Sequence, residues 1–389
     1  MGPDGDPRVV LVHDWLTGMR GGEKVLEVLC RRWPGAELFT LLHRKGSVSP
    51  AIERLKTHTS FLQRFPGVHG YYRYLLPLMP LAARWRLPAC DLVISSSHCV
   101  AKSAIPPPGV PHVCYCYTPM RYAWHMRSAY FGPGRPSNVK AWAQDRVLTW
   151  LRDWDRRTAE RVTHFIAISE TVSGRIRDCY NRSSTVIYPP VDTHCYTPAP
   201  VPRDNYYLVM SAFAPYKRLD LAILACNRLG KNLVVIGSGQ DGRRLRALAG
   251  PTVRFLGWQP DEVIRDHYRR CRALLFSGEE DFGIVPVEAQ ACGAPVIAFG
   301  RGGATETVVP LEPKLGSGFH EPTGMWFAEQ TVDCLIAALE GFERKSEQFN
   351  PAAARRQAVR FNKQRFESEL FGFLAEVLEP TPIPSRLAA

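Results

Sequence analysis

The sequence lacks any apolar run that is long enough to cross a lipid bilayer. The longest one, residues 74–83, contains two prolines, whereas a membrane-spanning helix needs about 20 apolar residues. A secretory leader is also not expected, because the polar first residues are followed directly by a strand-like run at 9–13. We therefore expect the protein to work in the cytoplasm.

The eleven cysteines form no recognisable framework. Only Cys114 and Cys116 lie close together, and no second pair follows at the spacing of a zinc site. An odd number of scattered cysteines is typical of a reducing compartment. The sequence also contains no HExxH motif, no Walker loop and no Ser/His/Asp order, so these three kinds of catalytic site are not expected.

Acidic residues are missing from one long segment. The net charge is +12, and residues 1–200 account for +11 of it, with 26 Lys and Arg against 15 Asp and Glu. Between 54 and 90 there is no acid, and Lys and Arg are interleaved with aromatic and aliphatic residues. This predicts contact with the inner face of the cytoplasmic membrane, although a helical hairpin with snorkelling arginines has the same composition. Without an RNA-binding motif, we expect no nucleic-acid partner.

Strand-like and helix-like segments alternate along the whole chain. The predicted strands are 9–13, 92–95, 113–117, 165–168, 185–188, 206–210, 233–236, 253–256, 273–276 and 296–299. Helices between them predict an α/β protein with two doubly wound domains that face a central cleft. A proline-rich stretch near 189–202 marks the linker. We predict domains at 1–195 and 196–365, and a C-terminal helix and tail at 366–389 that cross back to the first domain.

Two carboxylates, Glu280 and Glu288, flank a predicted helix start. An apolar strand at 273–276 precedes Glu280, Gly283 provides a turn, and residues 292–295 stop the helix. This order is typical of a ligand site at the carboxyl edge of a parallel sheet. The first N–H groups of the helix favour a phosphate, and the carboxylates can hold hydroxyls on either side of it, as a nucleotide sugar requires. A solvated helix face is the alternative, but Glu288 lies within an apolar run, where an unpartnered carboxylate is unfavourable.

Other predicted strand ends carry further candidates. Lys217 and Arg218 lie where a strand passes into a helix and can meet a diphosphate. The remaining candidates for ligand contact are Gly21, Gly22, Gly239, His98, Thr118 and Arg121. Glycines allow close approach to a phosphate, and Arg121 suits an anionic acceptor. A plain turn or a structural histidine explains several of these positions equally well.

Asp153 and Asp155 match the D-x-D pattern that holds a metal on nucleotide sugars. They lie in a charged, helical stretch, and residues two apart on a helix do not share a face. We therefore interpret the pair as surface or interdomain packing rather than as a metal site.

Several segments resemble the family 4 glycosyltransferases. The donor site of that family is similar to EDFGIVPVE, ACGAPVIA and GGATETV. Nearly the whole chain, including HDWLTGMRGGEKVLE, ISSSHCVAK, YTPMRYAW, FIAISETVSGRI and VIYPPVDT, resembles the branch found in bacterial exopolysaccharide and O-antigen clusters. The resemblance implies a GT-B fold and a retaining, metal-independent transferase. It would move a hexose, above all mannose from GDP-mannose, to a lipid-linked or polysaccharide acceptor.

The resemblance also implies residue roles. Glu280 would hold hydroxyls of the donor sugar, Glu288 would bind the ribose, and Lys217 would neutralise the leaving diphosphate. Sugar and phosphate would meet backbone N–H groups at Phe282, Gly283, Ile284 and Val285.

Three positions depart from the family pattern. Ala212 replaces a common arginine, Tyr117 replaces a histidine, and His125 replaces an aspartate. A sugar-nucleotide epimerase, a phosphorylase and a non-catalytic nucleotide-sugar-binding protein therefore stay as alternatives.

Overall fold

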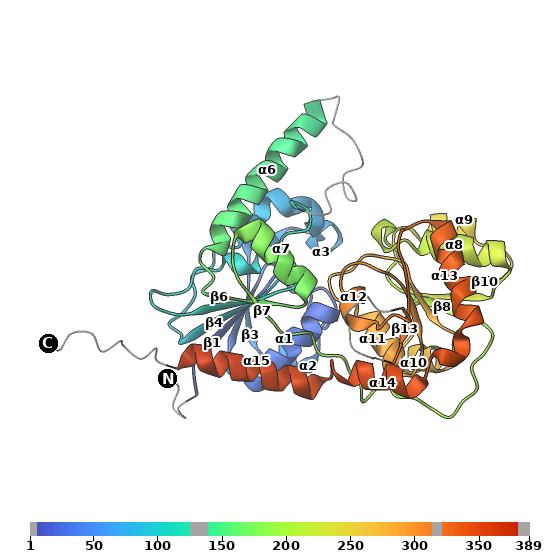
Figure 1. Cartoon of the computed structure of the whole chain (residues 1–389). Helices are drawn as coiled ribbons and strands as arrows, with labels where there is room; N and C mark the ends of the chain where they lie inside the picture. The colour runs from blue at the N-terminus through green and yellow to red at the C-terminus, as the bar shows by residue number, and fades with distance from the viewer. Residues whose placement is uncertain (1–5, 125–138, 313–320, 380–389) are drawn as a thin grey trace. The chain divides into compact units, whose positions relative to one another are not determined.

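The computed structural model describes residues 6–124, 139–312 and 321–379, and the chain forms two compact units (Figure 1). The first unit comprises Met1–Ile168, Val172–Ile187 and Phe366–Ala389, and the second comprises Ser169–Thr171 and Tyr188–Arg365. The chain passes into the second unit slightly before the predicted boundary after residue 195. His125 lies outside the described residues.

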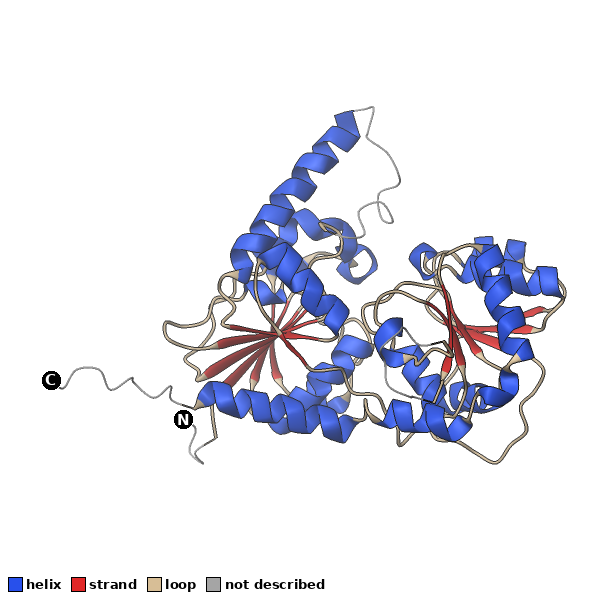
Figure 2. Ribbon diagram, in the orientation of Figure 1, coloured by secondary structure: helices blue, strands red, loops and turns tan. Residues whose placement is uncertain are grey.

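The first unit is built on a seven-stranded parallel sheet in the order β3-β2-β1-β4-β5-β6-β7. Its strands are β1 Val9–His13, β2 Glu37–Thr40, β3 Lys56–Thr59, β4 Leu92–Ser97, β5 His112–Cys116, β6 His164–Ala167 and β7 Thr185–Val186. Its α-helices are α1 Gly21–Arg32, α2 Pro50–Glu53, α3 Val68–Tyr71, α4 Met79–Ala82, α6 Val139–Ala159 and α7 Glu170–Tyr180, with most of α15 Lys363–Leu378. The central strands are wholly buried, because helices cover both faces of the sheet (Figure 2).

The second unit has a six-stranded parallel sheet in the order β10-β9-β8-β11-β12-β13. Its strands are β8 Tyr207–Met210, β9 Leu233–Ile236, β10 Val253–Gly257, β11 Leu274–Phe276, β12 Val296–Phe299 and β13 Gly324–Phe327. Its α-helices are α8 Leu219–Leu229, α9 Gly242–Leu248, α10 Asp261–Arg270, α11 Ile284–Ala291, α12 Ala304–Thr307, α13 Val332–Arg344 and α14 Pro351–Val359. Two doubly wound α/β units confirm the predicted fold class.

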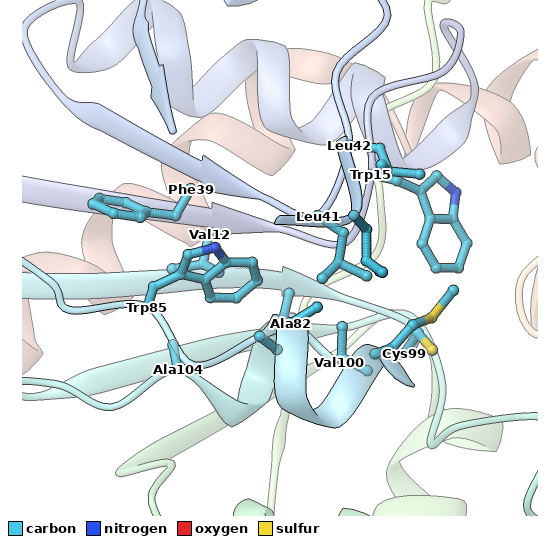
Figure 3. Packing of buried hydrophobic residues seen from close by; sticks show 14 of the residues in the cluster. Val12, Trp15, Phe39, Leu41, Leu42, Ala82, Trp85, Cys99, Val100 and Ala104 are labelled. Carbon is cyan, nitrogen blue, oxygen red and sulfur yellow. The ribbon is translucent and has the colours of Figure 1, made fainter. Parts of the chain in front are cut away.

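The segment that lacks acids contributes to the core of the first unit. Leu62, Tyr72, Leu76 and Met79 are buried in one apolar cluster. Figure 3 shows part of this cluster, where Trp85 lies beside Val12 and Phe39 from the sheet and Ala82 lies near Leu41 and Val100. The segment is therefore folded onto the sheet through one set of its apolar residues. No helix within the described ranges is long and apolar enough to cross a membrane.

Asp155 contradicts the interpretation of the D-x-D pair as surface or interdomain packing. Its side chain is fully buried inside the first unit, where Lys102 Nζ lies 2.5 Å from its Oδ1 atom. Trp124 Nε1 and the Tyr180 hydroxyl donate to its Oδ2 atom at 2.9 and 2.7 Å. The prediction was wrong because spacing along a helix shows which residues share a face, not whether that face is buried. Asp153, two residues earlier, is exposed.

We predict that Asp155→Asn destabilises the first unit strongly. The change leaves the Lys102 ammonium buried without a carboxylate, which typically costs about 3–5 kcal/mol. Asp153→Asn is the matched control, since an exposed site should shift stability by no more than about 0.5 kcal/mol. Denaturant unfolding of both variants measures the difference. Equal stabilities would contradict the assignment of Asp155 as the partner of a buried lysine.

Candidate functional site

The sheet of the second unit reverses its strand order between β8 and β11. From β8 the chain moves outward through β9 to β10, then returns to β11 and moves the other way through β12 to β13. The connections after β8 and β11 therefore diverge to opposite faces of the sheet. Such a reversal leaves a crevice outside the carboxyl ends of the two strands, where sheets of this kind bind their ligands.

A pocket lies at this point of reversal. Its polar lining includes Lys217, Ser277 and Glu280. The pocket has room for about one water molecule, so a larger ligand can enter only when the side chains that line the pocket move.

Lys217 and Glu280 form an ion pair that lines the pocket. Lys217 follows β8 and Glu280 follows β11, so the two residues come from the strands on either side of the reversal. Their side chains are only 14% and 24% exposed, and shielding from water strengthens the attraction relative to that of a surface pair. The fold thus joins the two predicted catalytic residues, whose roles stay predictions.

The loop that carries Glu280 is held by the turn after β12. The Gly303 N–H donates to the Glu280 carbonyl at 2.7 Å, and Glu280 forms a β-bridge with Gly302. A Cβ atom on Gly303 would lie 2.2 Å from Cα of Phe282, so only glycine fits. Gly302 and Gly303 therefore pack closely against this loop, and this close packing explains why both positions are glycine.

Helix α11 starts directly after the Glu280 loop, as predicted. Gly283 precedes it with φ 87°, a backbone conformation that favours glycine. Phe282 is buried and packs near Tyr188, while Ile284 and Val285 open the helix and are partly exposed. Their N–H groups are among the first of the helix, which lack partners within it.

Glu288 lies inside the unit rather than on a solvated helix face. It is 4% exposed, and the Tyr268 hydroxyl from α10 donates to its Oε2 atom at 3.2 Å. Burial and the nearby charge of Glu288 raise the pKa of Tyr268 well above its usual range, so this hydroxyl stays protonated. Tyr268 is a contact that the sequence did not predict, because it comes from a different helix.

The remaining predicted residues of the second unit have local partners. The Arg218 guanidinium forms an ion pair with Asp220 at 3.2 Å, so a carboxylate two residues away already neutralises part of its charge. A Cβ atom on Gly239 would lie 2.5 Å from the Phe213 carbonyl oxygen, which explains this glycine by packing against the turn after β8. Ala212, in place of the common arginine, is exposed.

Ser277 is a candidate that sequence reasoning missed. It directly follows β11, lines the pocket and is 5% exposed. Its hydroxyl makes no hydrogen bond to any residue that the structure describes. Buried polar atoms in folded proteins nearly always have a partner. A small polar residue at a strand end gives no sequence signal by itself, and only the pocket reveals it.

The candidates of the first unit gather at the carboxyl edge of β1, β4 and β5. Gly21 opens α1, and the Gly22 carbonyl accepts from the Tyr117 hydroxyl at 2.9 Å. Thr118 lies 3.5 Å from an Arg175 nitrogen, and Arg121 follows on the same loop. His98 follows β4 and contacts Asp14.

Comparison with known families matches both parts of the chain. Residues 198–357 match the model of glycosyl transferases group 1, and residues 7–194 match that of glycosyltransferase family 4. An uncharacterized glycosyltransferase of Methanocaldococcus jannaschii is 32% identical over 27% of this chain and 31% of its own length. A D-inositol 3-phosphate glycosyltransferase of Kineococcus radiotolerans is 29% identical over 48% of this chain and 50% of its own. The matches thus span about a third to a half of these relatives.

Solved structures share the fold over almost the whole chain. HepE of Anabaena in complex with UDP-glucose has a TM-score of 0.67 at 17% identity and covers 95% of this chain and 99% of its own. Sucrose-phosphate synthase of Thermosynechococcus elongatus has a TM-score of 0.68 at 16% identity, with the same coverage. At such identities the likeness shows the fold alone.

We predict opposite effects of Ser277→Ala on stability and on ligand affinity. Removing a buried hydroxyl that lacks a protein partner should raise the free energy of unfolding by about 1 kcal/mol. Loss of a hydrogen bond to a ligand should weaken nucleotide-sugar binding about tenfold, or 1.4 kcal/mol. Thermal unfolding and calorimetric titration measure the two effects, with Ser346→Ala as a control outside the pocket. A destabilised variant with unchanged affinity would show that the hydroxyl has a structural task.

Proposed function

Because the chain belongs to the family 4, group 1 glycosyltransferases, we propose that it transfers a hexose from a nucleotide diphosphate sugar with retention of configuration. The Lys217–Glu280 pair at the strand-order reversal carries this proposal. A cation and a carboxylate in one pocket match a donor that presents a phosphate and sugar hydroxyls side by side.

The main chemical task in this reaction is to stabilise the leaving diphosphate. Lys217 supplies a cation there, and the first N–H groups of α11 supply further positive charge. Glu280 accepts hydrogen bonds from the sugar hydroxyls, which fixes the ring beside Lys217. The acceptor oxygen bonds to the anomeric carbon on the face that the diphosphate vacates, and the hydroxyl proton passes to the leaving oxygen. Glu288 holds the ribose, with Tyr268 fixing one of its oxygens.

The donor must open the ion pair that closes the free pocket. A phosphate oxygen replaces Glu280 at the Lys217 ammonium, and a sugar hydroxyl replaces Lys217 at the carboxylate. Each charge then exchanges one partner for another, so neither is left buried and unpaired. Because protein cations neutralise the diphosphate, we propose that no metal cofactor takes part.

We further propose GDP-mannose as the donor. The similarity of the whole chain to the exopolysaccharide and O-antigen branch supports this choice. The solved relative HepE was crystallised with UDP-glucose, so an experiment has to test whether the nucleotide base of the donor is guanine or uracil. A thermal-shift comparison of GDP with UDP separates the two donor classes.

The acceptor in this proposal is a lipid-linked or polysaccharide glycan, which the protein meets at a membrane surface. The segment 54–90 shows large apolar side chains to solvent at Phe61, Phe65, Tyr71, Tyr74, Leu78 and Leu81. Its basic residues are exposed as well, at Arg54, Lys56, Arg64, Arg73, Arg84 and Arg86. Apolar insertion and attraction to anionic headgroups act together in such a segment. It therefore suits the anionic inner surface of a cytoplasmic membrane.

We predict that Glu280→Gln lowers the transfer rate at least about 100-fold, because the donor sugar loses its charged anchor. The same change frees Lys217 from its carboxylate, so affinity for the nucleoside diphosphate should increase. Glu279→Gln, one residue earlier, is the matched control, and chelation by EDTA should leave the wild-type rate unchanged. Transfer rates and calorimetric titration with GDP and UDP provide the readouts. An unaltered rate in Glu280→Gln would refute the proposed transferase site.

For the membrane contact, we predict that the double variant Tyr74→Ser, Leu81→Ser binds vesicles less tightly. These two side chains are 86% and 54% exposed, so the changes remove apolar insertion without touching the core. Ile105→Ser removes a similarly exposed apolar side chain elsewhere in the unit and should have no effect. Co-sedimentation with phosphatidylglycerol and phosphatidylcholine vesicles measures binding. Equal binding to both lipids would remove the electrostatic part of the proposal.

A further inference from the structure

A groove lies between helices α8 and α13 of the second unit, which pack side by side (Figure 1). Its volume is about 380 Å³, and small-molecule sites typically measure about 300–1,000 Å³. The groove can therefore hold a small organic molecule. Its lining comes from the end of α8, the turn after it and the last part of α13: Leu229, Lys231, Leu339, Glu340, Glu343 and Arg344.

The groove lies at the amino edge of the sheet of the second unit. Lys231 comes shortly before β9, and Tyr207, the first residue of β8, donates its hydroxyl hydrogen to Glu343 in the lining. In contrast, Lys217 and Glu280 follow the carboxyl ends of β8 and β11. The groove and the pocket at the strand-order reversal are therefore at opposite ends of the same strands, and they are separate sites.

One carboxylate of the groove, Glu343, already has three partners. The Tyr207 hydroxyl and the Lys231 ammonium donate to its Oε1 atom, and Arg272 forms an ion pair with its Oε2 atom. Burial alone would raise the pKa of Glu343, but the hydrogen bonds and the nearby cations outweigh burial and lower that pKa. Glu343 is thus a charged carboxylate that two cations share, which leaves one positive charge in surplus.

A ligand can reach this surplus charge at Lys231. The Lys231 side chain is 37% exposed, and its bond to Glu343 at 3.2 Å uses one of three ammonium hydrogens. On the rim, Arg344 and Glu340 are both exposed and lie one turn apart on α13. With Arg272, three cations surround the groove against two carboxylates. The balance of one positive charge favours a ligand with a single negative charge.

The rest of the groove is apolar. Leu229 is partly exposed at the end of α8, and Leu339 on α13 is buried. The methylene stems of Lys231 and Arg344 add apolar surface, because long charged side chains keep only their heads in water. A ligand that fills the groove therefore needs an apolar body as well as a charged head.

We propose that this groove is a second ligand site, which binds a small amphipathic carboxylate. Lys231 and Arg344 hold the carboxylate head, and the apolar body packs on Leu229. A carboxylate neutralises the single surplus charge, whereas a phosphate monoester carries a charge of about −1.5 to −2. When the head binds Lys231, Glu343 keeps its two other partners, so no charge is left buried and unpaired. The site is separate from the proposed glycosyl transfer and does not depend on it.

The first test compares octanoate with octylammonium, which has the same chain length and the opposite charge. In calorimetric titration, octanoate should bind the wild type at least about tenfold more tightly. Lys231→Gln keeps the stem and removes the charge, so it should weaken octanoate binding about tenfold. Lys345→Gln is the matched control, because Lys345 pairs with Glu312 at 3.0 Å outside the groove. Equal binding of the two probes, or unchanged octanoate binding in Lys231→Gln, would overturn the proposal.

The second test locates the probe on the protein. In protein with ¹³C-labelled leucine methyl groups, the Leu229 signals are assigned by their disappearance in Leu229→Ile, and octanoate should shift them. Saturating GDP or UDP should leave octanoate affinity unchanged, because the groove is not the donor pocket. Absence of a shift at Leu229, or displacement of octanoate by either nucleotide, would contradict the assignment. Neither readout measures glycosyl transfer, so a failure here leaves the proposed function standing, and loss of the proposed function leaves this site standing.

Discussion

All strands of a parallel sheet end at the same edge, and the functional candidates of this protein depend on that constraint. In the second unit it brings Lys217 and Glu280 together, although 62 residues separate them along the chain as the numbering of the sequence shows. In the first unit it places Asp14 beside His98. Helices that cover both faces leave this edge as the accessible part of the sheet. Chemistry therefore collects at the strand ends, and the core needs only apolar strands.

Three buried carboxylates show how the fold accommodates charge near this edge. Asp14 is satisfied by backbone N–H groups, Asp155 by Lys102 with Trp124 and Tyr180, and Glu288 by Tyr268. These contacts fix a turn at Asp14, a helix at Asp155 and a side chain at Glu288. A buried charge is tolerated only when such partners are complete. These residues hence tie the loops that bear the candidate ligand contacts to the rigid body of each unit.

The sequence predicted the elements whose signals are local. The β11–α11 region was recognised because an apolar strand, Gly283 and the stop after Ala291 follow one another. Strands β2, β3 and β13 were not predicted. β3 has no apolar run, and its pairing with β2 supplies what its composition does not. Asp155, Tyr268 and the Asp14–His98 contact depend on partners far away in the chain. Spacing alone carries no information on such partners, so burial and pairing had to come from the structure.

The closed ion pair in the pocket has a consequence for selectivity. A phosphate alone can engage Lys217 only by stranding Glu280, and a free sugar can engage Glu280 only by stranding Lys217. A molecule that carries a phosphate and a sugar hydroxyl at the right separation gives Lys217 and Glu280 a new partner each at the same time. If the donor binds at this pair as we propose, the pair selects a molecule that carries both groups and discriminates against small anions and free sugars.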